Sequence, residues 1–166
     1  MIAAVVLAAG AASRFGEPKQ RLLLPLVLER LRASPVDEIV VVSGAHELGI
    51  SNVRVVACPE WKRGPGASLR CGLAALSGET EAAVVCLADG PNLAPEAVGR
   101  VLEAWRTSLE DVVAASYEGS RGHPLLIARP AWGSVPDEGL RALPARLVSC
   151  DDLGAPGDVD EPGDLA

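Results

Sequence analysis

A segment of small and cationic residues near the N-terminus has the composition of a phosphate-binding loop. It runs from Leu7 to Lys19 and reads L-A-A-G-A-A-S-R-F-G-E-P-K. Its small residues let the backbone approach a ligand, so that several N–H groups can face one anion. Ser13 adds a hydroxyl, while Arg14 and Lys19 add forked and point-like positive charge. The loop therefore predicts a binding site for a triphosphate.

This loop follows neither of two widespread phosphate-binding patterns. A Walker A loop has Gly-Lys-Ser/Thr where a helix begins, whereas Gly16 is followed by Glu17 and Pro18. A dinucleotide fingerprint is G-x-G-x-x-G, but Gly10 is followed by two alanines. Kinase and dehydrogenase functions are therefore disfavoured.

Two aspartates are candidates for holding a metal ion beside the triphosphate. Asp89 ends a strongly apolar run, where an ionised carboxylate needs a cation or another partner. Asp160 lies in an acidic, Gly- and Pro-rich C-terminal segment, and its local sequence equally suits the N-cap of a short helix. Because Mg²⁺ is commonly held by one or two carboxylates plus substrate phosphates, we expect Mg²⁺ at Asp89.

Alternating strands and helices must position these residues. Apolar runs predict strands at Ile2–Leu7, Glu38–Ser43, Val53–Ala57, Ala82–Ala88, Val112–Ser116 and Pro124–Ala128. Helical spacing is found at Leu26–Ala33, Ala67–Leu76 and Pro95–Ser108. Continuous apolarity indicates strands that are covered on both faces. We therefore predict one α/β domain over residues 1–166, with a Rossmann-like, doubly wound, mostly parallel sheet and helices on both faces.

Such a sheet also predicts where the ligand lies. Ligands bind beyond the carboxyl ends of the strands, near the point where the strand order reverses. The first and fourth predicted strands end at Ala8–Gly10 and Ala88–Pro91. We therefore expect the Gly-rich loop and Asp89 to face one cleft.

Composition excludes several classes of function. The 166 residues carry a formal net charge of −7, which argues against a nucleic-acid partner because phosphate backbones need a basic face. Ile2–Ala9 is too short for a membrane span, so no membrane partner is expected. The four cysteines form no C-x-x-C pair and have mostly apolar or small neighbours. They predict buried, reduced thiols in a cytoplasmic protein rather than disulfides or a metal centre.

Five short motifs follow one another along most of the chain. They are Leu7–Lys19 as L-A-A-G-x-x-S-R-x-G-x-P-K, Cys58-Pro59-Glu60-Trp61 with Gly64 and Ser68-Leu69, Leu87-Ala88-Asp89-Gly90-Pro91, Arg121-Gly122-His123-Pro124, and Asp158-Val159-Asp160-Glu161-Pro162. Each is weak alone, but five in this order are specific. Together they strongly resemble the MobA-like nucleotidyltransferases, particularly the molybdenum cofactor cytidylyltransferase branch.

The resemblance implies a nucleotide-diphospho-sugar transferase-like fold and a set of site residues. It places the nucleotide at Leu7, Ala8, Ala9, Gly10, Ser13, Arg14, Lys19, Ser43, Pro59 and Ser68. It implies catalytic roles for Arg14, Lys19 and Asp89, Mg²⁺ ligation by Asp89 and Asp160, and an acceptor-binding role for His123. Two of these residues keep alternatives, because the Ser68 hydroxyl equally suits a helix cap and His123 a turn bonded to backbone.

The resemblance also implies a reaction. An NMP group, favoured as CMP from CTP by the L-A-A-G form, would pass to a phosphate of a pterin cofactor and release pyrophosphate. A molybdoenzyme or its chaperone would be the protein partner. A sugar- or alditol-phosphate nucleotidyltransferase and a catalytically silent nucleotide-binding domain remain as alternatives.

The chain departs from the family pattern in three segments. The G-G-x-P-L-L stretch is absent, because Pro25-Leu26 passes almost directly into Val27. The segments at residues 43–53 and 132–140 are also shorter than the family pattern. Either the chain is a shortened family member, or flexible residues of these segments are missing from the sequence.

Overall fold

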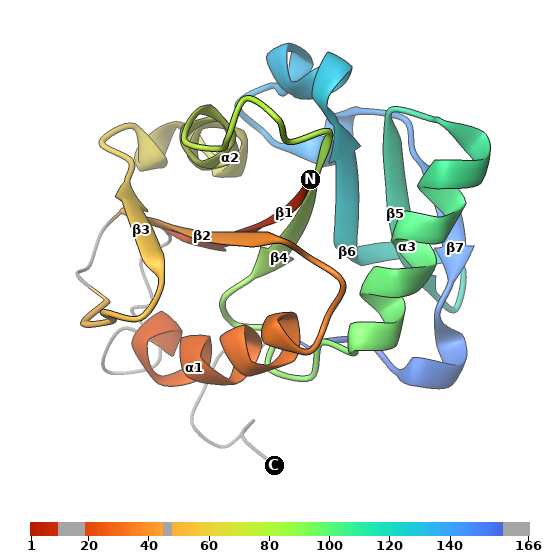
Figure 1. Cartoon of the computed structure of the whole chain (residues 1–166), viewed down its shortest axis with the longest axis horizontal. Helices are drawn as coiled ribbons and strands as arrows, with labels where there is room; N and C mark the ends of the chain where they lie inside the picture. The colour runs from red at the N-terminus through yellow and green to blue at the C-terminus, as the bar shows by residue number, and fades with distance from the viewer. Residues whose placement is uncertain (10–18, 45–47, 158–166) are drawn as a thin grey trace.

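One sheet of seven strands organises the chain (Figure 1). The computed structural model describes residues 1–9, 19–44 and 48–157, with the backbone alone for residues 19–21. The strands are β1 (Ile2–Ala8), β2 (Glu38–Ser43), β3 (Arg54–Ala57), β4 (Ala82–Leu87), β5 (Val112–Tyr117), β6 (Ser120–Ala128) and β7 (Arg146–Ser149). They lie in the order β3-β2-β1-β4-β6-β5-β7.

Strand directions agree with the prediction of a mostly parallel sheet. β1 pairs in parallel with both β2 and β4, β2 with β3, and β5 with β7. β6 is antiparallel to its neighbours β4 and β5. The order reverses at β1, since β2 lies on one side of it and β4 on the other. This reversal is where a ligand is expected in an open α/β sheet.

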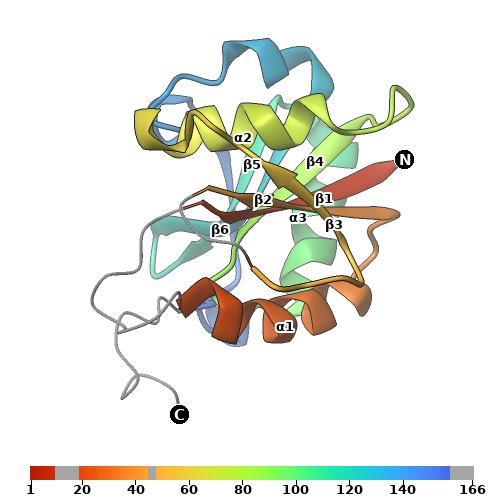
Figure 2. The same cartoon turned by 90° about the vertical axis from the view of Figure 1, so that its left-hand side faces the viewer.

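Helices cover both faces of the sheet (Figure 2). The helices are α1 (Lys19–Arg32), α2 (Pro65–Ala74) and α3 (Pro95–Ser108). Alternate residues of a strand point to opposite faces. Val84 therefore packs in the cluster with α1 and α3, while Val85 packs in the cluster with α2. The predicted fold class is confirmed.

α1 begins at Lys19, seven residues before the predicted start at Leu26. Pro25 lies inside this helix, although an interior proline removes a backbone donor and costs about 3 kcal/mol. Apolar residues at helical spacing continue through it, because Leu24, Val27 and Leu28 are all buried. Their burial offsets the cost of the proline.

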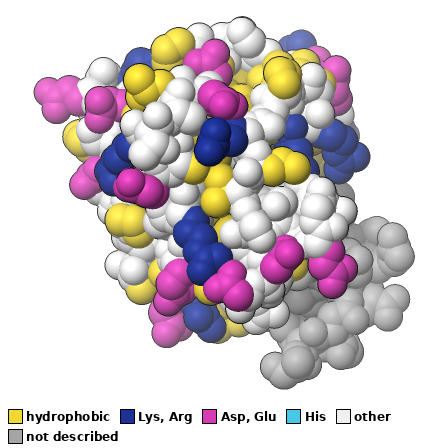
Figure 3. All heavy atoms as spheres, turned by 90° about the vertical axis from the view of Figure 1, so that its right-hand side faces the viewer, with side chains coloured by type: hydrophobic (Ala, Val, Ile, Leu, Met, Phe, Trp, Pro, Cys, Tyr) yellow, Lys and Arg dark blue, Asp and Glu magenta, His cyan; other side chains and the backbone are white. Residues whose placement is uncertain are grey.

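β7 was not predicted, because its sequence lacks the continuous apolar run on which the other strands were recognised. It is a four-residue edge strand, and two of its first three side chains are exposed. Its edge carries charges of both signs, and Figure 3 shows acidic and basic side chains intermingled over this face. Arg146 pairs here with Glu110 at 3.7 Å. No helix of the described residues is long and apolar enough to cross a membrane.

The prediction of reduced thiols is wrong for two of the four cysteines. Cys58, just after β3, and Cys71, in α2, form a disulfide across 13 positions. Cys86 and Cys150 are buried and free, as predicted. The disulfide fastens the segment after β3 to α2. By the chain-entropy argument, closing a loop of this size stabilises the fold by about 3 kcal/mol.

Candidate functional site

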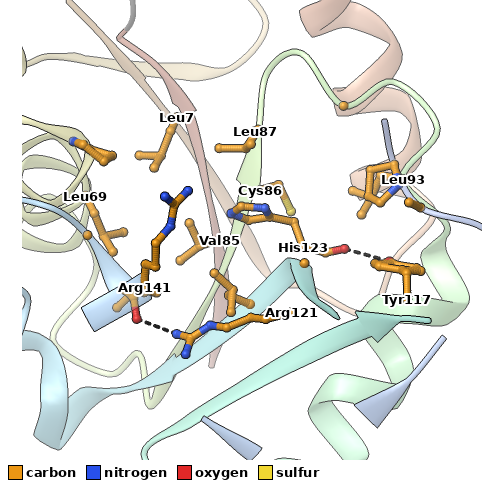
Figure 4. A pocket seen from close by; sticks show the side chains of 18 of the residues that line it. Leu7, Leu69, Val85, Cys86, Leu87, Leu93, Tyr117, Arg121, His123 and Arg141 are labelled. Atoms are coloured by element: carbon orange, nitrogen blue, oxygen red, sulfur yellow. Dashed lines mark hydrogen bonds between the residues drawn. The ribbon is translucent and has the colours of Figure 1, made fainter. Parts of the chain in front are cut away.

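A cavity of about 640 Å³ opens at the carboxyl ends of β1 and β4 (Figure 4). Leu7 of β1 and Leu87 of β4 are paired in register, and both line it. Because β6 is antiparallel to β4, with Leu125 opposite Val85, the beginning of β6 lies at this same edge. Segments from α2, from around residues 138–141 and from residues 155–157 complete the wall. The cavity is therefore at the predicted switch point.

His123 enters the cavity from β6, within the strand rather than in the predicted turn. The turn lies earlier, at Glu118 and Gly119, whose φ angles are 53° and 79°. The Tyr117 hydroxyl donates a 2.7 Å hydrogen bond to the His123 carbonyl oxygen. Burial raises the pKa of this tyrosine to about 12, so its hydroxyl stays protonated and available as a donor.

The imidazole of His123 is neutral near pH 7. Burial lowers its pKa from 6.5 to about 4. The negative charge of Asp89 raises the pKa, whereas the positive charges of Arg121 and Arg141 lower it further. His123 can therefore donate or accept a hydrogen bond in the cavity without adding charge.

This shift predicts a loss of stability in acid. Between pH 6.5 and about 4 the unfolded chain takes up a proton at His123 and the folded chain does not. The free energy of unfolding should fall as pH drops through this window, by about 3 kcal/mol from this group. We expect His123→Gln to lose less stability than the wild type in urea unfolding at pH 7, 6, 5 and 4. Parallel curves for the two proteins would contradict the shift.

Asp89 lies in the turn directly after β4 and is half-buried. It does not cap α3, because the N-cap of that helix is Ala94 and no side chain bonds there. The Asn92 backbone N–H donates to the Pro156 carbonyl oxygen at 3.1 Å, so residues 155–157 lie against the turn of Asp89. Asp160, the other predicted metal ligand, lies outside the described residues. Within the described chain, no group of three His, Cys, Asp or Glu side chains could hold a metal.

The predicted nucleotide-binding residues of the first three strands meet at one edge. Ala8 and Ser43 are paired at the ends of β1 and β2. The Cys58 N–H donates to the Ser43 carbonyl oxygen at 2.8 Å, which places Pro59 next to this edge. Ala9 is buried close by, since a Cβ at Gly44 would lie 2.7 Å from the Ala9 carbonyl oxygen. Leu7 connects this edge to the cavity.

The remaining predicted nucleotide-binding residues are less fully placed. Gly10, Ser13 and Arg14 lie outside the described residues, and Lys19 is the first residue of α1. Ser68 is the fourth residue of α2 and is 3% exposed. It is not the helix cap, because Gly64 occupies that position. The capping alternative for Ser68 is therefore wrong.

Sequence reasoning missed the contribution of residues 135–143. Residues 132–140 were noted only as a short segment, yet Leu140 and the following residue Arg141 line the cavity. Arg121 was recognised within a motif but received no role. Its guanidinium donates to the Leu143 carbonyl oxygen at 2.6 Å and also to that of Leu140. The turn-forming residues Pro136, Asp137 and Gly139 can be recognised in the sequence. The sequence does not show that Arg121 contacts this segment.

A family comparison matches residues 4–148 with the MobA-like NTP transferase domain. The chain belongs to this family. The solved structure of Rv0371c from Mycobacterium tuberculosis H37Rv is 27% identical, with a TM-score of 0.79 over 96% of this chain and 93% of that one. Its homologue from Mycobacterium sp. strain JC1 is 25% identical, with a TM-score of 0.80 over 96% and 90%.

A structure of Rv0371C in complex with manganese aligns at 24% identity and a TM-score of 0.70, over 99% of this chain and 92% of that one. No curated protein matches the chain. The MobA-like NTP transferase domain has the nucleotide-diphospho-sugar transferase-like fold that the motifs implied. Its activity class is nucleotidyl transfer, so the predicted family and reaction class are confirmed.

Proposed function

We propose that this MobA-like domain transfers a nucleoside monophosphate to a phosphate of a molybdopterin-type cofactor. The favoured nucleoside monophosphate is CMP, taken from CTP. An oxygen of the acceptor phosphate attacks the α-phosphorus of the nucleotide. The bond between the α-phosphorus and the bridging oxygen to the β-phosphate breaks, and pyrophosphate leaves in line. The acceptor phosphate is largely ionised near neutral pH, so the reaction needs no strong general base.

The observation that carries this proposal is the meeting of two sites at one sheet edge. The ends of β1, β2 and β3 gather the proposed nucleotide residues Ala8, Ser43 and Pro59. The cavity beside them, at the ends of β1 and β4, is the proposed place of the acceptor. Leu7 lies at the junction. A nucleotide and an acceptor bound on the two sides would have their reacting phosphates next to each other.

The proposed nucleotide contacts are Leu7, Ala8, Ala9, Gly10, Ser13, Arg14, Lys19, Ser43, Pro59 and Ser68. Arg14 and Lys19 stabilise negative charge on the β- and γ-phosphates as pyrophosphate forms. Asp89 is proposed as catalytic through metal binding, and His123 as a contact of the acceptor. Because its imidazole is neutral, His123 orients the acceptor by hydrogen bonding rather than by charge.

The residues at the end of β4 fit a divalent cation. Asp89 lies between Leu87 and Gly90, which line the cavity, and its negative charge raises the pKa of His123 there. One or two carboxylates plus phosphate oxygens are a common ligand set for Mg²⁺. Asp160, which follows Gly157 by three residues in the sequence, is proposed as the second carboxylate ligand. The Gly157 carbonyl oxygen itself lies close to Gly90, next to Asp89. When bound, the ion neutralises phosphate charge. The manganese complex of Rv0371C supports a divalent ion here.

Pyrophosphate release tests the proposal. The full chain is given CTP, GTP, UTP or ATP with Mg²⁺ or Mn²⁺, and either molybdopterin or a sugar phosphate. Release with CTP and molybdopterin supports the proposal. Release only with a sugar phosphate indicates a sugar- or alditol-phosphate enzyme. Tight nucleotide binding without release for any acceptor indicates a catalytically silent domain.

A cytoplasmic location and a molybdoenzyme or chaperone partner remain predictions.

A further inference from the structure

Arg141 presents to the cavity a positive charge that has no ion-pair partner in the described part of the chain. It lies in a short 3-10 turn, Leu140–Ala142, and its side chain extends into the cavity toward Leu7 and beside His123 (Figure 4). The positive charge of Arg141 acts within the cavity, because it lowers the pKa of His123. Among the described residues, no carboxylate forms an ion pair with Arg141, unlike Arg63, Arg70 and Arg100.

The second arginine of the cavity has a different role. Both terminal nitrogens of Arg121 donate to main-chain carbonyl oxygens, those of Leu140 and Leu143. These two carbonyls flank Arg141 in sequence. Arg121 is therefore a positioning residue that holds the backbone from which Arg141 projects.

The other end of the same segment is fixed on α2. The carboxylate of Asp137 accepts from Arg70 and, at 3.2 Å, from Arg63. The Gly66 N–H donates to the Asp137 carbonyl oxygen at 2.8 Å, and Arg70 donates to the Val135 carbonyl oxygen at 2.7 Å. With both ends of residues 135–143 held, the Arg141 guanidinium is presented on a backbone that is already ordered, which lowers the cost of binding an anion.

The rest of the wall selects the body of the ligand. Leucines come from three elements, with Leu69 from α2, Leu87 from β4 and Leu125 from β6. The imidazole of His123 adds a hydrogen-bonding group without charge. A polyol placed against these leucines would leave hydroxyls without partners, which costs free energy. A flat, largely apolar ring system would instead bury its surface there.

We propose that Arg141 binds the phosphate of an acceptor whose body is a ring system packed against these leucines. The forked guanidinium suits two oxygens of a phosphate monoester. Because Arg141 points toward Leu7, the bound phosphate would face the nucleotide side of the junction. This inference rests on the proposed function, since it names the acceptor class of that site and the residue that selects it.

Calorimetric titration of the full chain tests this inference with three probes. 1-Naphthyl phosphate has both the ring and the anion, 1-naphthol has only the ring, and glycerol 3-phosphate has only the anion on a polyol. We expect naphthyl phosphate to bind at least about tenfold more tightly than either other probe, since each part contributes over 1 kcal/mol. Equal binding of glycerol 3-phosphate would overturn the assignment of the acceptor class.

Variants then test the residue. Arg141→Gln should weaken naphthyl phosphate binding by about 10- to 100-fold, as for loss of a charge-assisted contact, and Arg141→Lys should weaken it less. The matched control Arg106→Gln removes an exposed arginine at the end of α3 and should change nothing. Undiminished binding in Arg141→Gln would overturn the proposal. Absence of pyrophosphate release with Arg141-dependent naphthyl phosphate binding would overturn the proposed function but support the anion site.

Discussion

Asp89→Asn is expected to lower kcat for nucleotidyl transfer by about 10²- to 10³-fold while the protein stays folded. The substitution keeps the size of the side chain and removes its negative charge. Asp89 stands at the end of β4, beside the cavity and within the electrostatic reach of His123. On the proposed assignment, loss of the carboxylate would remove a protein ligand of the divalent cation, and the charge of the triphosphate would be less well neutralised.

Three measurements separate this role from a structural one. Pyrophosphate release gives kcat, thermal unfolding reports the fold, and titration with Mn²⁺ followed by electron paramagnetic resonance reports metal affinity. Glu103→Gln, an exposed carboxylate on α3, is the matched control and should leave all three unchanged. Asp89→Ala, which removes the whole carboxyl group, should abolish turnover. Full activity in either Asp89 variant would show that the metal assignment is wrong.

The position of Asp89 was predictable because it depends on local patterns. A continuous apolar run predicts a buried parallel strand, and an acidic residue at its carboxyl end then falls at the ligand-binding edge of the sheet. The boundaries of β2 and α3 were predicted for the same reason, since each has one clear pattern. β4 was predicted one residue longer than Ala82–Leu87, because Ala88 is also apolar.

What the sequence could not predict depends on contacts between distant residues. Cys58 and Cys71 pair only because α2 lies against the segment after β3. Arg121 and Arg141 are 20 positions apart in the sequence. Arg121 donates to the backbone, and Arg141 faces the cavity, because two carbonyl oxygens lie within reach of Arg121. No spacing rule distinguishes an arginine that donates to backbone from one that faces a cavity. The direction of β6, which brings His123 to the site, is likewise a property of the whole sheet.

Gly66→Ala is expected to destabilise the fold strongly, because its Cβ would have the closest backbone contact of the described glycines. Gly66 is the second residue of α2, where its helical backbone would normally favour alanine. A Cβ at this position would overlap the carbonyl oxygen of Pro136 and come 2.9 Å from that of Asp137. Because both obstacles are backbone atoms, the segment of residues 135–143 must move away from α2. We expect a loss of about 2 kcal/mol or more in the free energy of unfolding.

The matched control is Gly99→Ala in α3, where a Cβ would meet no atom within 4 Å. This variant should be as stable as the wild type or more stable, by up to about 1 kcal/mol, because alanine is the better helix former. The two substitutions add the same methyl group to helical glycines, so their difference in urea unfolding isolates the contact with Pro136.

The same pair of variants connects the fold to the cavity. Arg141 projects from the segment that Gly66→Ala displaces, so this variant should also weaken 1-naphthyl phosphate binding, whereas Gly99→Ala should not. A destabilised Gly66→Ala protein that still binds the probe with wild-type affinity would show that Arg121 alone suffices to position Arg141. Unchanged stability in Gly66→Ala would contradict the close packing of α2 on Pro136. In the proposed site, the close approach of α2 to Pro136 at Gly66 would therefore help to hold the Arg141 guanidinium where the acceptor phosphate would meet the nucleotide.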